Sequence, residues 1–259
     1  MKRPLEAQNP DRPSPEGREP MANVAEIGAQ VACGVCAMKS LCHGRGAVAV
    51  ALSPVECRRR LAAGETLYDA GSPQANVYAL RAGFLKLAVP DAAGGTHIVR
   101  FLLPGDVAGL DAFAGDAHSS AAIVLEDCEV CQIPVYRLEL LAEYQGRIRA
   151  HLHELLAREL ADAQGHAAAL AGLTAAQRVA GFLLEFARRW TVRGFSGTEF
   201  RLPMGRRELG EHLGLTMETV SRVLSDFRAQ GVIALPRGGR GMKILSPAML
   251  ARALGSVRH

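Results

Sequence analysis

The chain has 259 residues, of which 49% are hydrophobic and 22% are charged, which suits a globular protein of about two domains. It shows neither an apolar signal region nor a run of roughly 18 apolar residues, which argues against secretion and a membrane span and favours the cytoplasm. Residues 174–259 carry 14 Lys or Arg against 6 Asp or Glu, whereas residues 1–173 carry 16 against 20, so the C-terminal third should meet a polyanion.

The first expected elements are a tail and a cysteine segment. Residues 1–28 are polar and rich in proline, and because they cannot bury enough apolar surface to fold, they should form a flexible tail. Residues 29–46 contain Cys33, Cys36 and Cys42 in the spacing C-x2-C-x5-C. In a reducing compartment, clustered cysteines more often indicate metal or redox chemistry than disulfides.

Three interpretations of this cysteine segment compete. A structural zinc site of four thiolates usually combines paired C-x2-4-C units, and the segment has only one. Plain reduced cysteines usually lie buried as small apolar side chains, which a short glycine-rich segment does not favour. An iron–sulfur cluster needs about four thiolates, one of them often distant in the sequence. The distant candidates are Cys57, Cys128 and Cys131, and spacing alone does not choose among them.

Residues 47–137 are expected to form an antiparallel β-roll, a cupin-like jelly roll. Short apolar runs alternate there with Gly, Pro and Asp turn signals, a pattern typical of a small all-β domain. The clearest runs are residues 77–83, 84–89, 96–103 and 121–125.

Residues 138–171 change to a helical period, and Gly146 should separate a short helix from a longer one. The longer helix carries a narrow apolar stripe that would pack against the same helix of a second copy. The predicted dimer interface consists of Ile148, Leu152, Leu156, Leu160, Ala163 and Ala167. The alternative is a helix that lies on its own β-roll, although its length exceeds one face of a small roll. We therefore expect a homodimer.

Residues 172–259 are predicted to form a winged helix-turn-helix domain. Gly214 would end one helix by adopting a positive φ, and the Thr216 hydroxyl would cap the next. The fold class is then α+β, with an N-terminal β-roll, a long dimerisation helix and a C-terminal winged helix-turn-helix. The expected helices and wing occupy residues 175–189, 206–213, 217–230 and 232–245.

The helix at 217–230 should present one polar face to the major groove of double-stranded DNA. Arg, Glu and Ser side chains on such a face can contact base edges, and flanking arginines attract phosphates regardless of sequence. The alternative is a helical hairpin whose Glu-Arg face is merely solvated, which leaves the wing and the basic charge unexplained. The candidate DNA contacts are Arg206, Arg207, Thr216, Glu218, Ser221, Arg222 and Arg240.

Four motifs carry a family resemblance: Leu213-Gly-Leu-Thr-Met-Glu-Thr-Val-Ser-Arg-Val-Leu, Gly64-Glu-Thr-Leu-Tyr, Leu103-Pro-Gly-Asp-Val-Ala-Gly and Arg193-Gly-Phe-Ser. Over roughly residues 31–250 the chain resembles the FNR branch of the CRP/FNR regulators. The resemblance implies a homodimeric transcription regulator that contacts RNA polymerase and binds palindromic sites with TTGAT-type half-sites. It also implies that Glu218, Ser221 and Arg222 read the bases.

The same resemblance implies a fourth thiolate ligand. FNR-type sensors carry it just before an Ile-Pro that closes the β-roll, and Cys131-Gln-Ile-Pro134 matches that pattern. Together with the three N-terminal cysteines, Cys131 would hold a 4Fe–4S cluster that senses O2 and stabilises the dimer. Cys57 and Cys128 depart from the family pattern.

Three other functions are less well supported by the sequence. A cyclic-nucleotide-responsive regulator needs an Arg to capture the phosphate, and residues 104–120 contain neither Arg nor Lys. A haem sensor would use His43, His97 or His118 and would leave the cysteines unexplained. An enzyme on a cupin-like roll needs converging His and carboxylate ligands, and the roll has no H-x-H spacing. We therefore expect that the protein is not an enzyme.

Overall fold

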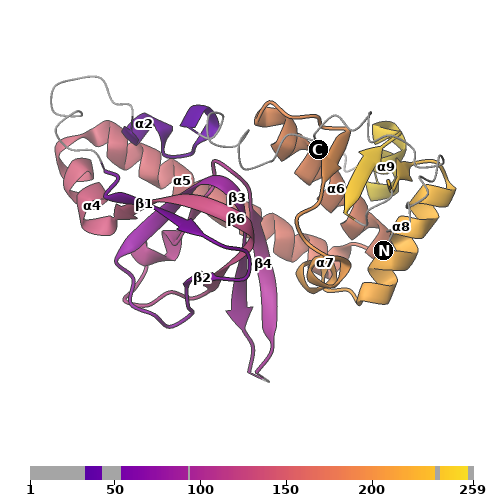
Figure 1. Cartoon of the computed structure of the whole chain (residues 1–259), viewed down its shortest axis with the longest axis horizontal. Helices are drawn as coiled ribbons and strands as arrows, with labels where there is room; N and C mark the ends of the chain where they lie inside the picture. Colours follow the sequence, from indigo (N-terminus) through magenta and orange to yellow (C-terminus); the bar gives the residue numbers. More distant parts are fainter. Residues whose placement is uncertain (1–32, 43–53, 93, 237–239, 256–259) are drawn as a thin grey trace, which may run out of the picture.

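The computed structural model describes residues 33–42, 54–92, 94–236 and 240–255, so the flexible tail predicted for residues 1–28 lies outside it. Figure 1 shows a β-sheet domain at one end, a mostly helical C-terminal domain at the other, and the long helix α5 passing behind the sheet toward the C-terminal helices. In the described part of the chain, no helix is long and apolar enough to cross a lipid bilayer.

The N-terminal domain is an antiparallel sheet of six strands, which confirms the predicted β-roll. The strand order is β1-β6-β3-β4, with β2 paired to β6 and β5 paired to β3. A 3-10 helix, η1 (Leu110–Phe113), follows β5. The strands are β1 (Cys57–Leu61), β2 (Thr66–Tyr68), β3 (Asn76–Pro90), β4 (Thr96–Leu102), β5 (Val107–Ala108) and β6 (Ala121–Pro134).

Strand β3 is one continuous element where the sequence predicted two runs that meet at Gly83. Gly83 has φ 81°, and a Cβ atom there would lie 2.3 Å from the backbone oxygen of Asp127 on β6. The β3–β6 register shifts on both sides of this residue, so Gly83 is a bulge and not the end of a strand. Gly83 therefore lets the strand continue past its closest neighbour.

Strands β3 and β6 are buried on both faces because they separate two hydrophobic clusters. The inner cluster fills the roll and includes Leu80, Leu85 and Cys128. The outer cluster lies between the sheet and the helices, where the cysteine segment also packs. We call it the junction cluster; its buried members are Met38, Leu41, Val77, Ala79, Val107, Ile133, Leu138, Leu141, Ile148, Leu152 and Leu155.

Two helices follow the roll, as predicted from Gly146. A single residue, Gln145, separates helix α4 (Val135–Tyr144) from helix α5 (Gly146–Gly172). Only the first turns of α5 are buried within the protomer, whereas most side chains beyond Leu156 are exposed. The structure thus gives α5 two parts: an N-terminal part that packs on its own roll and a C-terminal part with an open face.

The C-terminal domain has the predicted winged helix-turn-helix form. It contains α6 (Ala175–Val192), α7 (Arg206–Leu213), α8 (Met217–Ala229) and α9 (Pro247–Leu254). Its three-stranded sheet has the order β7-β9-β8, formed by Glu199–Arg201, Gly241–Ile244 and Ile233–Ala234. Strands β8 and β9 are the predicted wing, while β7 and α9 were not predicted. The domain shares one hydrophobic cluster with Phe84, Ile98, Phe101 and Leu103, so it packs directly on the roll.

Candidate DNA-binding and metal sites

The helix-turn-helix has the predicted local geometry. Gly214 ends α7 with φ 61° and ψ 41°, and the Thr216 side chain accepts a hydrogen bond from the Thr219 backbone N–H at 3.2 Å. At Gly210 a Cβ atom would lie 2.6 Å from the backbone oxygen of Leu215, so only glycine allows the turn to approach α7 this closely. These residues fix the angle between the two helices, which determines how α8 can enter a groove.

Helix α8 separates its core side chains from its candidate base contacts. Its buried residues are Val220, Val223, Leu224 and Phe227. Glu218 and Arg222 are exposed, Ser221 is half-buried, and no ion pair joins Glu218 or Arg222 to another described residue. The polar face predicted to read DNA is therefore open to a partner.

The arginines expected to contact phosphates differ in how accessible they are; they are Arg206, Arg207 and Arg240. Arg207 is the most open, since its side chain is 85% exposed and lies 3.6 Å from Glu211. Arg240 donates to the Pro203 carbonyl at 3.0 Å and lies 3.9 Å from Glu126 on β6. Arg206 is half-buried, and its Nη1 atom has no hydrogen-bond partner among the described residues. Arg207 is thus the most accessible of these arginines to DNA, whereas Arg206 and Arg240 lie closer to the protein.

Arg178 on α6 is a residue of this site that the sequence prediction missed. Its Nε donates to the Leu173 carbonyl at 2.9 Å, and its Nη1 donates to the Leu213 carbonyl at 2.7 Å. Leu213 is the last residue of α7, and Leu173 caps the end of α5, so one guanidinium joins the long helix to the helix-turn-helix. The only sequence signal is a charged residue among the apolar positions of α6.

The thiols of the four proposed metal ligands lie near enough to influence one another electrostatically. Cys36 and Cys131 both pack against the junction cluster, and α2 (Lys39–Cys42) ends at Cys42. Desolvation of the Cys42 thiol, followed by the negative charges of Cys36, Cys131 and Cys33, raises its pKa to about 12. Burial likewise raises the pKa of Cys36, and the charges of Cys131 and Cys33 raise it further. The four sulfur atoms therefore share one neighbourhood.

The other two cysteines lie elsewhere. Cys128 is 5% exposed and belongs to the inner cluster of the roll, whereas Cys131 contacts the junction cluster on the other side of β6. Cys57 is exposed on β1 and lies opposite Gln132, one position away from the pair Arg58 and Cys131. Neighbouring positions on a strand face opposite sides of the sheet, so neither Cys57 nor Cys128 faces the N-terminal cysteines. Within the described residues, however, no group of three or more His, Cys, Asp or Glu side chains has the arrangement of a formed metal site.

The cysteine segment is attached to both the roll and α5. Met38 is fully buried and Leu41 is 5% exposed, and both pack into the junction cluster. The Ala37 backbone N–H donates to the Gly105 carbonyl at 2.8 Å. On the other side, the Nε2 atom of His151 on α5 donates to the Ala37 carbonyl at 2.6 Å. The position of this segment is thus linked directly to the first turns of α5.

The dimer interface predicted along α5 is buried within the protomer at its start and exposed further along the helix. Ile148 and Leu152 are buried in the junction cluster of their own protomer, as the alternative interpretation of this helix required. Leu156 is half-buried, whereas Leu160 is 60% exposed. Ala163 and Ala167 are also exposed, so the candidate surface for a second copy begins about three turns into the helix.

The segment that would capture a cyclic nucleotide makes its hydrogen bonds internally. Asp111 lies 3.0 Å from His118 Nδ1, and it accepts from the Ser119 backbone N–H at 2.8 Å. Burial alone would raise the pKa of Asp111, but these hydrogen bonds outweigh burial and lower it. His118 is 3% exposed and stacks on Tyr68 with ring centroids 3.8 Å apart, which leaves it poorly placed as a haem ligand. His97 is 68% exposed, and His43 lies outside the described residues.

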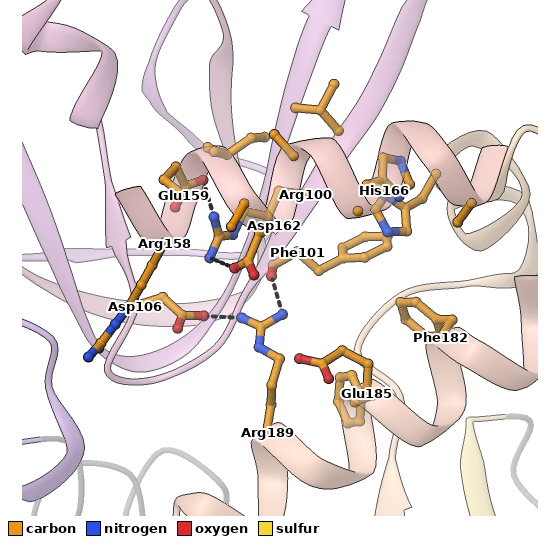
Figure 2. Close-up of a pocket in the computed structure, with 18 of the residues that line it drawn as sticks. Arg100, Phe101, Asp106, Arg158, Glu159, Asp162, His166, Phe182, Glu185 and Arg189 are labelled. Carbon is orange, nitrogen blue, oxygen red and sulfur yellow. Dashed lines mark hydrogen bonds and ion pairs between the residues drawn. The ribbon is translucent and has the colours of Figure 1, made fainter. Parts of the chain in front are cut away.

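A cavity of about 640 Å³ lies between β4, α5, α6 and α7, and Figure 2 shows its charged lining. Arg100 on β4 forms ion pairs with Glu159 and Asp162 on α5. Arg189 on α6 pairs with Asp106 and also donates to the Phe101 carbonyl at 3.2 Å. These arginines are neutralised by the chain itself, so an anionic ligand would have to displace an existing carboxylate.

Comparisons with known proteins agree with this geometry. A family model described as a Crp-like helix-turn-helix domain matches residues 177–253, and one described as a cyclic nucleotide-binding domain matches residues 58–144. The two matches coincide with the domain that carries α7 and α8 and with the β-roll.

Three similar proteins cover most of the chain. The transcriptional activator protein anr of Pseudomonas aeruginosa is 38% identical over 76% of this chain and 80% of its own length. The fumarate and nitrate reduction regulatory protein of Escherichia coli K12 is 35% identical over 79% and 81%. The solved structure of FixK2 from Bradyrhizobium japonicum has a TM-score of 0.72 and 32% identity over 78% of this chain and 98% of that one. The chain therefore belongs to the CRP/FNR family of DNA-binding transcription regulators.

Proposed function

We propose that this regulator responds to oxygen through a 4Fe–4S cluster held by Cys33, Cys36, Cys42 and Cys131. In this proposal the cluster-loaded homodimer acts in the cytoplasm, binds palindromic DNA with TTGAT-type half-sites and contacts RNA polymerase. The observation that carries the proposal is the neighbourhood of these four thiols, from which Cys57 and Cys128 are excluded by strand register.

The chemistry of the donor set fits such a cluster. Four soft sulfur donors are present, three on one short segment and one on β6, as in sites with one distant cysteine. When bound, a 4Fe–4S cluster supplies a redox centre that dioxygen can oxidise. The name of a relative agrees, since the Escherichia coli protein is named for the reduction of fumarate and nitrate.

The residues around the cysteines would carry the signal to α5. Met38 and Leu41 pack in the same cluster as Ile148 and Leu152, and Ala37 accepts a hydrogen bond from His151. A segment retained by its cysteines therefore restrains the first turns of α5 against the roll. When the cysteines no longer hold the segment, α5 loses that restraint, and the two α5 helices of a dimer pair less firmly.

Each protomer presents one reading helix, so specific binding of a palindrome requires the dimer. Glu218, Ser221 and Arg222 would contact the bases, because they lie on the open face of α8. Arg206, Arg207 and Arg240 would contact phosphates, while Thr216 holds the start of α8. Since Arg240 is partly engaged with the protein, DNA would have to compete for it.

The test is anaerobic reconstitution of the full-length protein with iron and sulfide, read by absorbance and by bound iron. Serine substitutions at positions 33, 36, 42 and 131 should each abolish cluster binding. Cys57→Ser is the matched control, since Cys57 is exposed on the edge of the same sheet and should keep full iron. Cys128→Ala should also keep it.

DNA binding is then measured with a palindromic TTGAT duplex before and after exposure to air. The proposal requires a dimer with high affinity under nitrogen and a large loss of affinity in air. A colourless protein that binds the duplex equally well in both atmospheres would contradict it. In that case, added cyclic nucleotide or haem would identify the alternative CRP-family activator.

A further inference from the structure

Two of the sequence motifs that carry the family resemblance contact each other in the folded chain. The first is the turn of residues 103–106, Leu-Pro-Gly-Asp, and the second begins at Arg193, just after α6. Arg193 Nε donates to the Pro104 carbonyl at 2.5 Å, and Arg193 Nη2 donates to Asp106 Oδ1 at 2.6 Å. Arg189, one turn earlier on α6, pairs with the other carboxylate oxygen of Asp106, as Figure 2 shows.

This contact is buried and specific. Arg193 is only 8% exposed, and its Nη1 donates to the Arg189 carbonyl at 2.8 Å, so its guanidinium is fully engaged. Asp106 also accepts from the Leu103 backbone N–H at 2.7 Å, which fixes the shape of the turn. A buried, forked ion pair of this kind holds its partners in one orientation, because breaking one side leaves a charge without a partner.

The opposite side of the same turn contacts the cysteine segment. The Gly105 carbonyl accepts a hydrogen bond from the Ala37 backbone N–H at 2.8 Å. Gly105 has φ 101°, and a Cβ atom there would lie 2.9 Å from the Val35 backbone oxygen, so glycine is needed for this approach. Residues 104–106 thus have the cysteine segment on one side and the end of α6 on the other.

We infer that Asp106 and Arg193 are positioning residues that couple the cysteine segment to the DNA-binding domain within one protomer. The inference rests on the proposed function, because it assumes that the cysteine segment changes state. Ala37 is then the branch point: its carbonyl is held by His151 on α5, and its N–H is held by the turn that grips α6. The signal reaches the DNA-reading domain through this turn as well as through the pairing of α5.

The other ion pairs between the roll and the C-terminal domain do not contact the cysteine segment. Lys86 pairs with Glu208 at 2.8 Å, and Glu126 pairs with Arg201 at 2.5 Å and with Arg240 at 3.9 Å. None of these pairs involves residues 33–42 or a residue bonded to them, as far as the described residues extend. These pairs can brace the two domains, but they offer no direct path from the cysteines.

The test is hydrogen–deuterium exchange on the reduced, full-length protein, comparing the wild type with Arg193→Gln. The peptide of interest is residues 33–42, which is remote in sequence from the substitution. We expect its exchange to become about fivefold faster, near the lower end of common coupling strengths between sites. Arg188→Gln is the matched control, because Arg188 lies on α6, is 66% exposed and pairs with Glu185 of its own helix. This control should leave the exchange rate of residues 33–42 unchanged.

Two further variants keep the test decisive. If Arg193→Gln does not fold, Arg193→Lys and Asp106→Asn replace it; lysine retains the charge but cannot serve Pro104 and Asp106 together, so a smaller increase is expected. Faster exchange near residues 100–107 and in α6, with residues 33–42 unchanged, would show a local brace and overturn the inference. An unchanged pattern throughout would overturn it as well.

A second measurement separates this inference from the proposed function. Bound iron and the ratio of DNA affinities under nitrogen and in air are measured for the same variants. Coupling through the turn predicts that Arg193→Gln retains iron and a dimer but loses about fivefold of the affinity ratio. If the wild type holds no iron, the oxygen proposal fails, while the exchange experiment still decides whether the turn connects the two regions.

Discussion

Replacement of Arg178 by Met tests whether one side chain joins α5 to the helix-turn-helix. Methionine keeps an unbranched apolar stem but removes the donors to the Leu173 and Leu213 carbonyls, which are 2.9 and 2.7 Å away. A hydrogen bond from a charged group contributes about 1.5–3 kcal/mol. Because Arg178 is only half-buried, we take the lower end for two bonds and expect a loss of about 2–3 kcal/mol.

The assay is urea denaturation followed by tryptophan fluorescence. The chain has a single tryptophan, Trp190, which is 7% exposed and stacks on Phe195 inside the C-terminal domain. With a urea dependence of about 1–3 kcal/mol per molar, the midpoint should fall by about 0.7–3 M. Arg188→Met removes the same charge from an exposed position of the same helix and should change the midpoint little. Equal shifts for the two variants would refute the assigned role of Arg178.

Three further predictions concern assembly, DNA recognition and pH. Leu160→Arg, on the exposed part of α5, should dissociate the dimer in analytical ultracentrifugation without changing the monomer's circular dichroism. Arg222→Ala should weaken binding to the palindrome by about 5- to 150-fold but leave nonspecific binding nearly unchanged, whereas Arg207→Ala should weaken both and lower the salt dependence. Burial, followed by the charge of His166, lowers the pKa of His212 from 6.5 to about 4. As the pH falls below 6.5, the unfolded chain therefore binds a proton at His212 before the folded chain does. The free energy of unfolding should fall by up to about 3 kcal/mol between pH 6.5 and pH 4. His212→Gln should flatten this decline, measured by urea titrations at each pH.

The helix-turn-helix was predictable because its determinants are local. Gly214 ends α7, Thr216 caps α8, and the apolar positions of α8 follow the helical period, so three short-range signals agree. Helix α7 accordingly begins and ends where the sequence placed it. The β-roll was predicted as a class, but β3 was predicted as two separate runs, because the bulge at Gly83 becomes apparent only when the neighbouring strand is known.

The cysteine site shows the opposite case. Spacing alone could not choose the fourth ligand among Cys57, Cys128 and Cys131. The choice depends on which face of the sheet each cysteine occupies, and pairing with distant strands determines that face. The register of β1 and β3 on β6 separates them, and it pairs Cys131 with Arg58 and Ala79, which are 73 and 52 positions away in the sequence. The contact between Asp106 and Arg193 spans 87 positions, and the sequence contains no local trace of it.

Helix α5 serves two purposes along its length, and this division affects the fate of the separated protomer. Ile148, Leu152 and Leu155 are already satisfied by the protomer's own junction cluster, so they do not become exposed when two copies part. Separation of two copies would therefore leave this part of the core packed, and would not expose it to the chaperones and proteases that recognise unfolded chains. Under the proposed function, recovery after a signal would need a restored cluster and reassembly of the dimer, but not a newly synthesised chain.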